Sequence, residues 1–204
     1  MIKLFGHPAS TCTRKVLFTL NETNTPYELE MVDITKGAHK SPEYVARQPF
    51  GQLPALDDDG FKMFESRAIA RYIDEKAGHK LTPKHAQGRA KMEQWISVET
   101  SDFYPHAMKF VYHDVFKRAQ PEDVLANAGA KLEQCVGVMD AALAASGKAF
   151  LVGDELTLAD VVFAPYVEYC MTSPSAKAIF AKHPHFTAWW NRVSERPAWQ
   201  KVRA

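Results

Sequence analysis

A short polar segment near the start of the chain, GHPASTCTRKV, holds a hydroxyl and a thiol two positions apart, on Ser10 and Cys12. Both residues stand where this segment passes into an apolar-faced helical pattern, so both belong to a predicted helix start. A serine there ordinarily caps the helix through its hydroxyl. The same hydroxyl, beside helix amides without partners, could instead stabilise a thiolate. Cys12 could itself be a reactive thiol, although a lone cysteine more often fills a small apolar space.

A second group of candidate residues lies in QPFGQLPALDDDGFKMFESRAIARYI. Leu53 and Pro54 open a predicted strand, and with a cis bond between them the Leu53 backbone could pair with an extended peptide. Glu65 and Ser66 open a predicted helix, whose free amides favour a carboxylate. Together these features suit a small peptide that carries a carboxylate. The alternative is that Pro54 only forms a turn and that Ser66 only caps its helix.

The elements that must position these residues belong to a part of the chain that mixes strands and helices. Residues 27–32 alternate apolar and charged side chains, as a half-buried strand does. The turn sequence DDDG joins two short apolar segments into a predicted antiparallel hairpin. The expected strands are Ile2–Phe5, Tyr27–Val32, Leu53–Leu56 and Phe61–Phe64, and the expected helices are residues 11–22 and Glu65–Ala77.

The rest of the chain follows helical patterns. Residues 79–86 are a predicted linker, and apolar side chains recur at helical spacing through residues 121–146. In LTLADVVFAPY, Thr157 and Asp160 have the spacing of a capping box, and Pro165 falls inside the same helix. We therefore predict an α/β domain at residues 1–78 and an all-α helical bundle domain at residues 87–204.

The composition argues against several classes of function. Lys and Arg total 25 and Asp and Glu total 24, a formal net charge of +1, so no nucleic acid or anionic membrane partner is expected. No apolar run approaches the roughly 18 residues that a membrane helix needs, and the start of the chain has no apolar core typical of a signal peptide. The three cysteines form no CxxC pattern, so neither a disulfide framework nor a zinc site is predicted. We expect a reduced, cytoplasmic protein without a metal.

Five segments, in this order and spacing, resemble the cytosolic glutathione transferases, and most of all their phi class. They are GHPASTCTRKV, HK at residues 39–40, FGQLPAL, FESRAIARYI and LTLADVVFAPY. The resemblance covers essentially the whole chain. It implies a thioredoxin-like N-terminal domain, a helical C-terminal domain and a homodimer. It also implies that glutathione is the co-substrate and that no metal or redox cofactor is needed.

The resemblance further implies a role for each site residue. Ser10 would donate a hydrogen bond to the glutathione sulfur and hold it as thiolate. His39 and Lys40 would contact the glycyl carboxylate, whose charge suits theirs. The remaining glutathione-binding residues would be Gln52, the Leu53 backbone before Pro54, Glu65 and Ser66 at the γ-glutamyl end, and Arg67 in support.

The implied reaction joins the glutathione thiolate to small hydrophobic electrophiles. The expected apolar pocket lies between the domains and draws on the first helix of the second domain, at Phe103, Tyr104, Met108, Tyr112 and Phe116. Two alternatives remain. One is a glutathione-dependent peroxidase or thiol transferase that uses Cys12. The other is a non-catalytic carrier of hydrophobic ligands, although such a carrier would have no need for Ser10.

Overall fold

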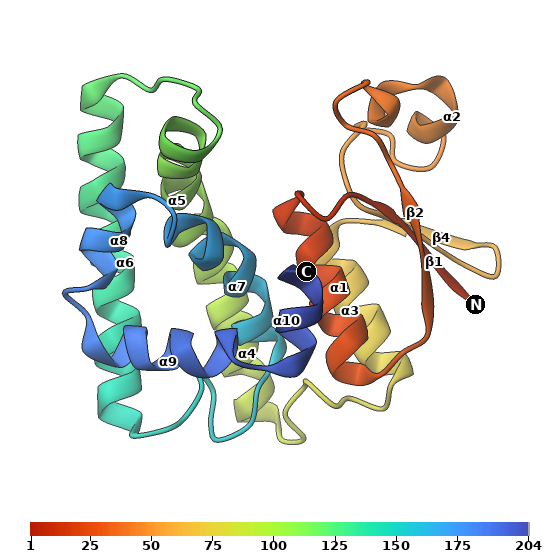
Figure 1. The fold of residues 1–204 in the computed structure, drawn as a ribbon. Coiled ribbons are helices and arrows are strands. Elements are labelled where there is room, and N and C mark those ends of the chain that lie inside the picture. The colour runs from red at the N-terminus through yellow and green to blue at the C-terminus, as the bar shows by residue number, and fades with distance from the viewer. Residues whose placement is uncertain (204) are drawn as a thin grey trace. The chain divides into compact units, whose positions relative to one another are not determined.

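The computed structural model describes residues 1–203 and divides the chain into two units. Met1–Lys80 and the residues from Pro197 onward make the first unit, and Leu81–Arg196 make the second. The first unit mixes a sheet with helices, whereas every regular element of the second is helical (Figure 1). The predicted fold class, an α/β domain followed by a helical one, is confirmed.

A four-stranded sheet in the order β2-β1-β3-β4 organises the first unit. Its strands are β1 (Ile2–Gly6), β2 (Tyr27–Met31), β3 (Ala55–Asp58) and β4 (Phe61–Phe64). Strand β1 runs parallel to β2 and antiparallel to β3, and β3 pairs antiparallel with β4. The predicted hairpin is confirmed, although β3 begins at Ala55, after the proline that has no N–H to donate to a sheet ladder.

Helices α1 (Thr11–Thr23) and α3 (Ser66–Lys76) lie on the same side of this sheet (Figure 1). Ile2 and Leu4 of β1 are buried while Lys3 between them is exposed, because successive side chains of a strand point to opposite faces. The last helix, α10 (Pro197–Arg203), packs on α1 through the Phe18 and Trp199 rings, whose centroids are 5.1 Å apart. The first unit therefore ends with a helix that returns to it from the far end of the chain.

Two short helical segments follow β2: the 3₁₀ turn η1 (Ala38–Lys40) and the helix α2 (Pro42–Val45). A small apolar cluster of Val32, Tyr44 and Ala55 anchors them, with Phe5 packed against it. Phe5 and Ile2 project from opposite faces of β1, so these segments pack against part of the face that α1 and α3 leave open.

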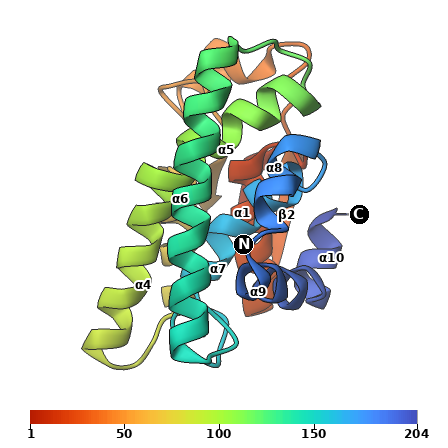
Figure 2. The same ribbon diagram turned by 90° about the vertical axis from the view of Figure 1, so that its left-hand side faces the viewer.

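The second unit consists of helices around one buried helix, α7 (Leu158–Cys170). The long helix α6 (Glu122–Ser146) contacts α5 (Tyr104–Phe110), α8 (Pro174–Phe180) and α9 (Pro184–Ser194), as Figure 2 lets the reader follow. The helical pattern of residues 121–146 is thus confirmed. None of the helices described within residues 1–203 is both long and apolar enough to cross a membrane.

The first helical stretch of this unit changes its winding twice. Between α4 (Ala86–Val98) and α5 lies a π-helical turn, η2 (Glu99–Phe103), and a second, η3 (Val111–Val115), follows α5. Pro105, near the start of α5, has no backbone N–H, and such an interruption of the hydrogen-bond ladder allows a local change of winding. The sequence analysis did not anticipate these turns.

The predicted capping box at α7 is present and is more extensive than its spacing indicates. The Asp160 carboxylate accepts hydrogen bonds from the Thr157 N–H at 2.9 Å and the Thr157 hydroxyl at 3.0 Å. It also accepts from the Leu151 N–H at 3.0 Å and from the Trp189 indole at 2.8 Å. Asp160 therefore ties the loop before α7 to α9, besides capping its own helix.

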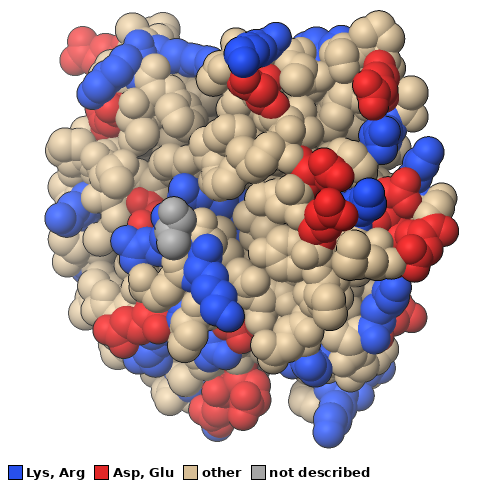
Figure 3. Space-filling view, turned by 45° about the vertical axis from the view of Figure 1, so that its right-hand side comes forward, with Lys and Arg blue, Asp and Glu red and all other residues tan. Residues whose placement is uncertain are grey.

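On the face that Figure 3 shows, Lys and Arg side chains are interspersed with Asp and Glu side chains. The two signs alternate over short distances, in keeping with the formal net charge of +1. Neither sign forms a large continuous field on this face.

Candidate active site

The register of the sheet brings the candidate residues of the first unit toward one end of it. Strand β1 leaves the sheet after Gly6, which pairs with Met31 at the end of β2. Phe5 pairs with Ala55 at the start of β3, and Ala55 pairs with Phe64 at the end of β4. The segments that carry Ser10, His39 and Lys40, Leu53 and Pro54, and Glu65 and Ser66 therefore all adjoin the same end of the sheet.

Ser10 is the N-cap residue of α1. Its backbone is extended, with φ −80° and ψ 122°, and its Oγ accepts a hydrogen bond from the Thr13 N–H at 3.3 Å. A hydroxyl that accepts in this way keeps its own proton to donate elsewhere. The first turn of α1 contains no acidic residue, so the partial positive charge of the helix start is not neutralised from within that turn.

Cys12 occupies the second position of the same helix. Its side chain is partly exposed, and its thiol is not in a disulfide. Cys135 and Cys170 also have free thiols, but they are buried in the second unit, where burial raises the pKa of Cys135 to about 12. Among the three cysteines, Cys12 is therefore the accessible one.

The segment before β3 is braced by two side chains that the sequence analysis did not single out. The Tyr44 hydroxyl donates to the Gln52 carbonyl at 2.8 Å, and the Gln48 Oε1 accepts from the Gln52 N–H at 3.2 Å. The Gln52 side chain is left exposed, Leu53 is partly buried, and the bond from Leu53 to the buried Pro54 is cis. Neither Tyr44 nor Gln48 carries a sequence signal for this role, because the role depends on a turn of the backbone.

His39 and Lys40 lie in η1, directly beside this segment. The Lys40 Nζ donates to the Phe50 carbonyl at 3.2 Å. Gly51 has a φ of +57°, and a Cβ placed on it would lie 2.9 Å from the His39 carbonyl oxygen, so only glycine permits this approach. The His39 Nδ1 is buried and has no hydrogen-bond partner within the described part of the chain. A buried nitrogen without a partner is costly, which marks it as a group that a ligand could satisfy.

Glu65 and Ser66 form the start of α3. Glu65 is exposed and has a φ of +74°, a conformation that non-glycine residues adopt at a cost and that is enriched at functional sites. Ser66 is only 3% exposed, at the first position of the helix. Arg67 follows, and its carbonyl accepts a hydrogen bond from the Arg71 Nη1 at 2.9 Å. The Glu65 side chain makes no cap hydrogen bond to α3.

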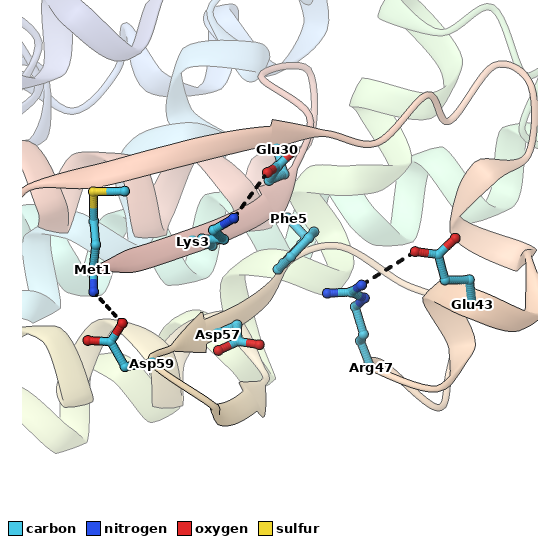
Figure 4. Close-up of a pocket in the computed structure, with 8 residues that line it drawn as sticks. All are labelled: Met1, Lys3, Phe5, Glu30, Glu43, Arg47, Asp57 and Asp59. Carbon is cyan, nitrogen blue, oxygen red and sulfur yellow. Dashed lines mark hydrogen bonds and ion pairs between the residues drawn. The ribbon is translucent and has the colours of Figure 1, made fainter.

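A hollow of about 470 Å³ lies on the face of the sheet opposite α1 and α3 (Figure 4). It is lined by Met1, Lys3, Phe5, Glu30, Glu43, Arg47, Asp57 and Asp59. Most of its charged groups pair with one another: Arg47 with Glu43 at 3.4 Å, and the Met1 amino group with Asp59 at 2.7 Å. This hollow contains none of the candidate residues.

No three His, Cys, Asp or Glu side chains within residues 1–203 are grouped as metal ligands would be. The candidate residues at this end of the sheet offer hydroxyls, helix amides, a thiol, an imidazole and charged side chains.

Comparisons with known proteins identify the family. The model of the glutathione S-transferase N-terminal domain matches residues 1–75, and that of the C-terminal domain matches residues 100–197. Glutathione S-transferase F11 of Arabidopsis thaliana is 36% identical over 99% of this chain and 97% of its own length. Glutathione S-transferase 3 of Zea mays is 38% identical over 100% of this chain and 93% of its own.

Solved structures agree with these matches. Glutathione transferase F7 from Populus trichocarpa superposes with a TM-score of 0.92, at 35% identity, over 100% of this chain and 98% of the other. Glutathione S-transferase I from maize, solved with an atrazine glutathione conjugate, superposes with a TM-score of 0.89, at 30% identity, over 98% of this chain and 95% of the other. The N-terminal domain is thus the thioredoxin-like domain of this fold, and the chain belongs to the glutathione S-transferases as a transferase enzyme similar to their phi class.

Proposed function

We propose that this transferase joins the thiolate of glutathione to small hydrophobic electrophiles and that the Ser10 hydroxyl stabilises that thiolate. The observation that carries the proposal is the state of the Ser10 hydroxyl. Its oxygen accepts from the Thr13 N–H, so its proton remains available to a sulfur placed at the start of α1. The partial positive charge at the start of α1, whose first turn contains no acidic residue, favours an anion at the same place.

We propose that each chemical group of glutathione meets candidate residues of complementary type. The glycyl carboxylate would be bound by Lys40 and by the unpartnered His39 Nδ1, with the imidazole as hydrogen-bond donor. The cysteinyl backbone would pair with Leu53 as an added strand. The γ-glutamyl end would lie at the start of α3, with its ammonium on Glu65 and its carboxylate on Ser66. We propose that Gln52, Pro54 and Arg67 complete this site.

The reaction needs two steps from these residues. The bound thiol loses its proton to solvent, and the Ser10 hydroxyl donates a hydrogen bond to the resulting sulfur anion. The thiolate then attacks an electrophilic carbon, a carbon–sulfur bond forms, and a leaving group departs with the displaced electron pair, or an activated double bond takes that pair up. Stabilising the anion raises the reactive fraction at neutral pH, and fixing its position supplies much of the remaining acceleration. Glutathione provides the nucleophile, so the proposed reaction uses no metal or redox cofactor.

For the electrophile, we propose contact with an aromatic surface of the second unit. The Phe116 ring lies 5.7 Å from Tyr169 and 6.2 Å from Tyr112, and Tyr104 lies 5.3 Å from Tyr166, in each case between centroids. Tyr104 and Phe116 are 38% and 41% exposed, as a binding surface requires. The atrazine conjugate bound by the maize relative supports an electrophile of small hydrophobic type.

Two of the expected pocket residues do not share this exposure. Phe103 is fully buried against Phe163, with ring centroids 5.1 Å apart, and Met108 is 7% exposed. Both are core residues of the second unit, so we propose Tyr104, Tyr112 and Phe116 as the residues that meet the electrophile. We further propose a homodimer in the cytoplasm with a detoxifying role, which the resemblance to cytosolic transferases supports.

One specific observation keeps a second function in view. Cys12 is partly exposed and lies two residues from Ser10, at the start of the same helix. A thiolate there could attack a disulfide or peroxide substrate, which is reduced as the cysteine is oxidised. One glutathione would then give the mixed disulfide, and a second would release the Cys12 thiolate as glutathione disulfide forms.

The experiment that separates the two functions is a pH titration of the bound thiolate by ultraviolet difference absorption. It would compare the wild type, Ser10→Ala and Cys12→Ala, each paired with the rate of conjugation to an aryl halide. We expect Ser10→Ala to lose most of the thiolate signal and rate at neutral pH, and Cys12→Ala to keep both. Loss of activity in Cys12→Ala alone would favour the cysteine-based function. Glutathione binding without thiolate in the wild type would favour a carrier.

A further inference from the structure

The loop that carries Ser10 is held by hydrogen bonds within itself and from helix α1. The Ser10 N–H donates to the His7 carbonyl at 2.8 Å, and the Ala9 N–H donates to the His7 Nδ1 at 3.1 Å. From the helix, the Thr13 Oγ1 accepts from the His7 N–H at 3.4 Å, and the Arg14 Nε donates to the Pro8 carbonyl at 2.6 Å. A four-residue connection between β1 and α1 is thus fixed at each of its positions.

The bond from Arg14 differs from the others in two respects. It is the shortest of the four, and its donor is a charged guanidinium, which makes stronger hydrogen bonds than a neutral group. It also holds the residue two positions before Ser10, and the ring of Pro8 leaves that residue little backbone freedom. Movement of the Pro8 carbonyl would therefore pass directly to Ser10.

Arg14 is a positively charged residue close to Ser10 on helix α1. Arg14 lies in the first turns of α1, where a positive charge is disfavoured by the helix dipole and no acidic residue of the first turn compensates it. The backbone N–H of Arg14 donates to the Ser10 carbonyl at 2.9 Å, in the regular i to i−4 pattern of a helix. The two residues are therefore neighbours on one face of α1. The Arg14 side chain turns toward the loop that precedes Ser10, where its Nε–H donates to the Pro8 carbonyl.

We infer that Arg14 is a positioning residue for the Ser10 hydroxyl. Its Nε–H to Pro8 carbonyl bond holds the loop so that Ser10 reaches the sulfur of bound glutathione. This inference rests on the proposed function, in which Ser10 stabilises the thiolate. It assigns Arg14 no contact with substrate. We expect that lysine does not replace Arg14, because its ammonium group lacks the planar guanidinium whose Nε–H has a fixed direction.

The test compares Arg14→Lys, Arg14→Gln, Ser10→Ala and the double variant Ser10→Ala with Arg14→Lys. Arg89→Lys is the matched control: its Nη1 donates to the Lys84 carbonyl at 2.6 Å near the start of α4, in the other unit. For each variant, three quantities are measured: the midpoint pH of the bound thiolate, kcat and KM for glutathione with an aryl halide, and the melting temperature.

We expect Arg14→Lys to raise the thiolate midpoint by about one pH unit and to lower kcat about tenfold below that midpoint, with KM for glutathione nearly unchanged. Arg14→Gln should do the same, and Arg89→Lys should leave all three quantities at wild-type values. In the double variant, Arg14→Lys should add nothing to the effect of Ser10→Ala, because Arg14 acts through Ser10.

Three results would overturn the inference. The first is a thiolate midpoint that stays at the wild-type value in Arg14→Lys, even if activity falls with the folded fraction. The second is a midpoint that Arg14→Gln raises and Arg14→Lys does not, since charge alone would then be acting. The third is an additive effect in the double variant. Failure of the proposed function is recognised separately, by a midpoint that Ser10→Ala does not move.

Discussion

Replacing Asp160 with asparagine should destabilise the second unit strongly. The Asp160 side chain is fully buried, and burial raises the pKa of its carboxyl group. Four donors face it: the Thr157 N–H and hydroxyl on Oδ2, and the Leu151 N–H and Trp189 Nε1 on Oδ1. These hydrogen bonds favour the ionised form and act against the effect of burial. The buried carboxylate is thus tolerated because both of its oxygens are satisfied.

The size of the effect follows from the number of donors. Asp160→Asn keeps the shape of the side chain but turns one oxygen into an NH₂ group that faces two donors. With the NH₂ group on the side of Leu151 and Trp189, two donors lose their acceptor. With it on the side of Thr157, the Thr157 N–H loses its acceptor, while the Thr157 hydroxyl can turn and accept from the amide. The second orientation costs less, and at about 1.5–3 kcal/mol for a lost bond to a charged group we expect a loss of about 1.5–3 kcal/mol in the free energy of unfolding. Urea unfolding, followed by tryptophan fluorescence and circular dichroism, measures it.

Asp140→Asn is the matched control, because Asp140 also caps a helix from a distance. Its Oδ1 accepts one hydrogen bond, from the Phe186 N–H at the start of α9, at 2.9 Å. An amide oxygen can still accept that bond, so we expect a loss of about 1 kcal/mol or less. If Asp160→Asn cost no more than Asp140→Asn, at an unchanged urea slope, the reasoning from four convergent donors would be refuted.

Three further predictions concern the first unit. His39→Ala should raise KM for glutathione about tenfold with little change in kcat, because the proposed hydrogen bond from the imidazole to glutathione is lost. Steady-state kinetics at varied glutathione measure KM, and an unchanged KM would contradict this role of His39. Gly51→Ala should lower the free energy of unfolding by about 1–3 kcal/mol and weaken glutathione binding. The cause is the φ of +57° and the His39 carbonyl oxygen, which lies 2.9 Å from the new Cβ. Equal melting temperatures of the variant and the wild type would contradict this. Hydrogen bonds from Lys76 and Tyr72 lower the pKa of Asp58 in the folded protein. The stability that this carboxylate contributes is therefore fully present above its unfolded-state pKa, about 4, and is lost as the pH falls from there through the lower folded-state pKa. Asp58→Asn should therefore flatten the acid side of the stability curve in urea titrations at several pH values, and an unchanged slope would count against the network.

The elements that the sequence predicted well are those with a local cause. The helix at residues 121–146 matches α6 closely, because an apolar face at helical spacing needs no knowledge of its partners. The hairpin matches because DDDG specifies a turn whatever surrounds it, and Asp59 and Gly60 indeed have φ values of +50° and +96°. The capping box at Thr157 and Asp160 follows from spacing alone.

What the sequence could not predict depends on distant partners. The sequence predicted one helical domain from residue 87 onward, yet α10 belongs to the first unit, where Trp199 packs on Phe18. The carboxylate of Asp160 meets Trp189, 29 positions along the chain, which no capping motif implies. The spacing of residues along one element shows which face packs, but it does not identify the partner of that face elsewhere in the chain.

The candidate active site combines both cases. Ser10, His39, Glu65 and their neighbours can be selected by residue type and family resemblance, and their roles remain predictions. Their convergence follows from the sheet register, in which Phe5, Ala55 and Phe64 are successive partners across three strands. A shift of one residue in either pairing would turn the following segments to the other face of the sheet.

The residues that hold the candidate site in shape are chemically ordinary, which is why the sequence analysis passed over them. Tyr44 and Gln48 fix the Gln52 backbone through a carbonyl and an amide, and Arg14 fixes the Ser10 loop through a carbonyl. Side chains that bind backbone groups in this way need only the right length and a polar end, so several residue types would pass a motif search equally well. Distances distinguish them. A site of this kind is therefore predicted from sequence as a set of reacting groups, and the structure adds the groups that place them, beginning with Arg14.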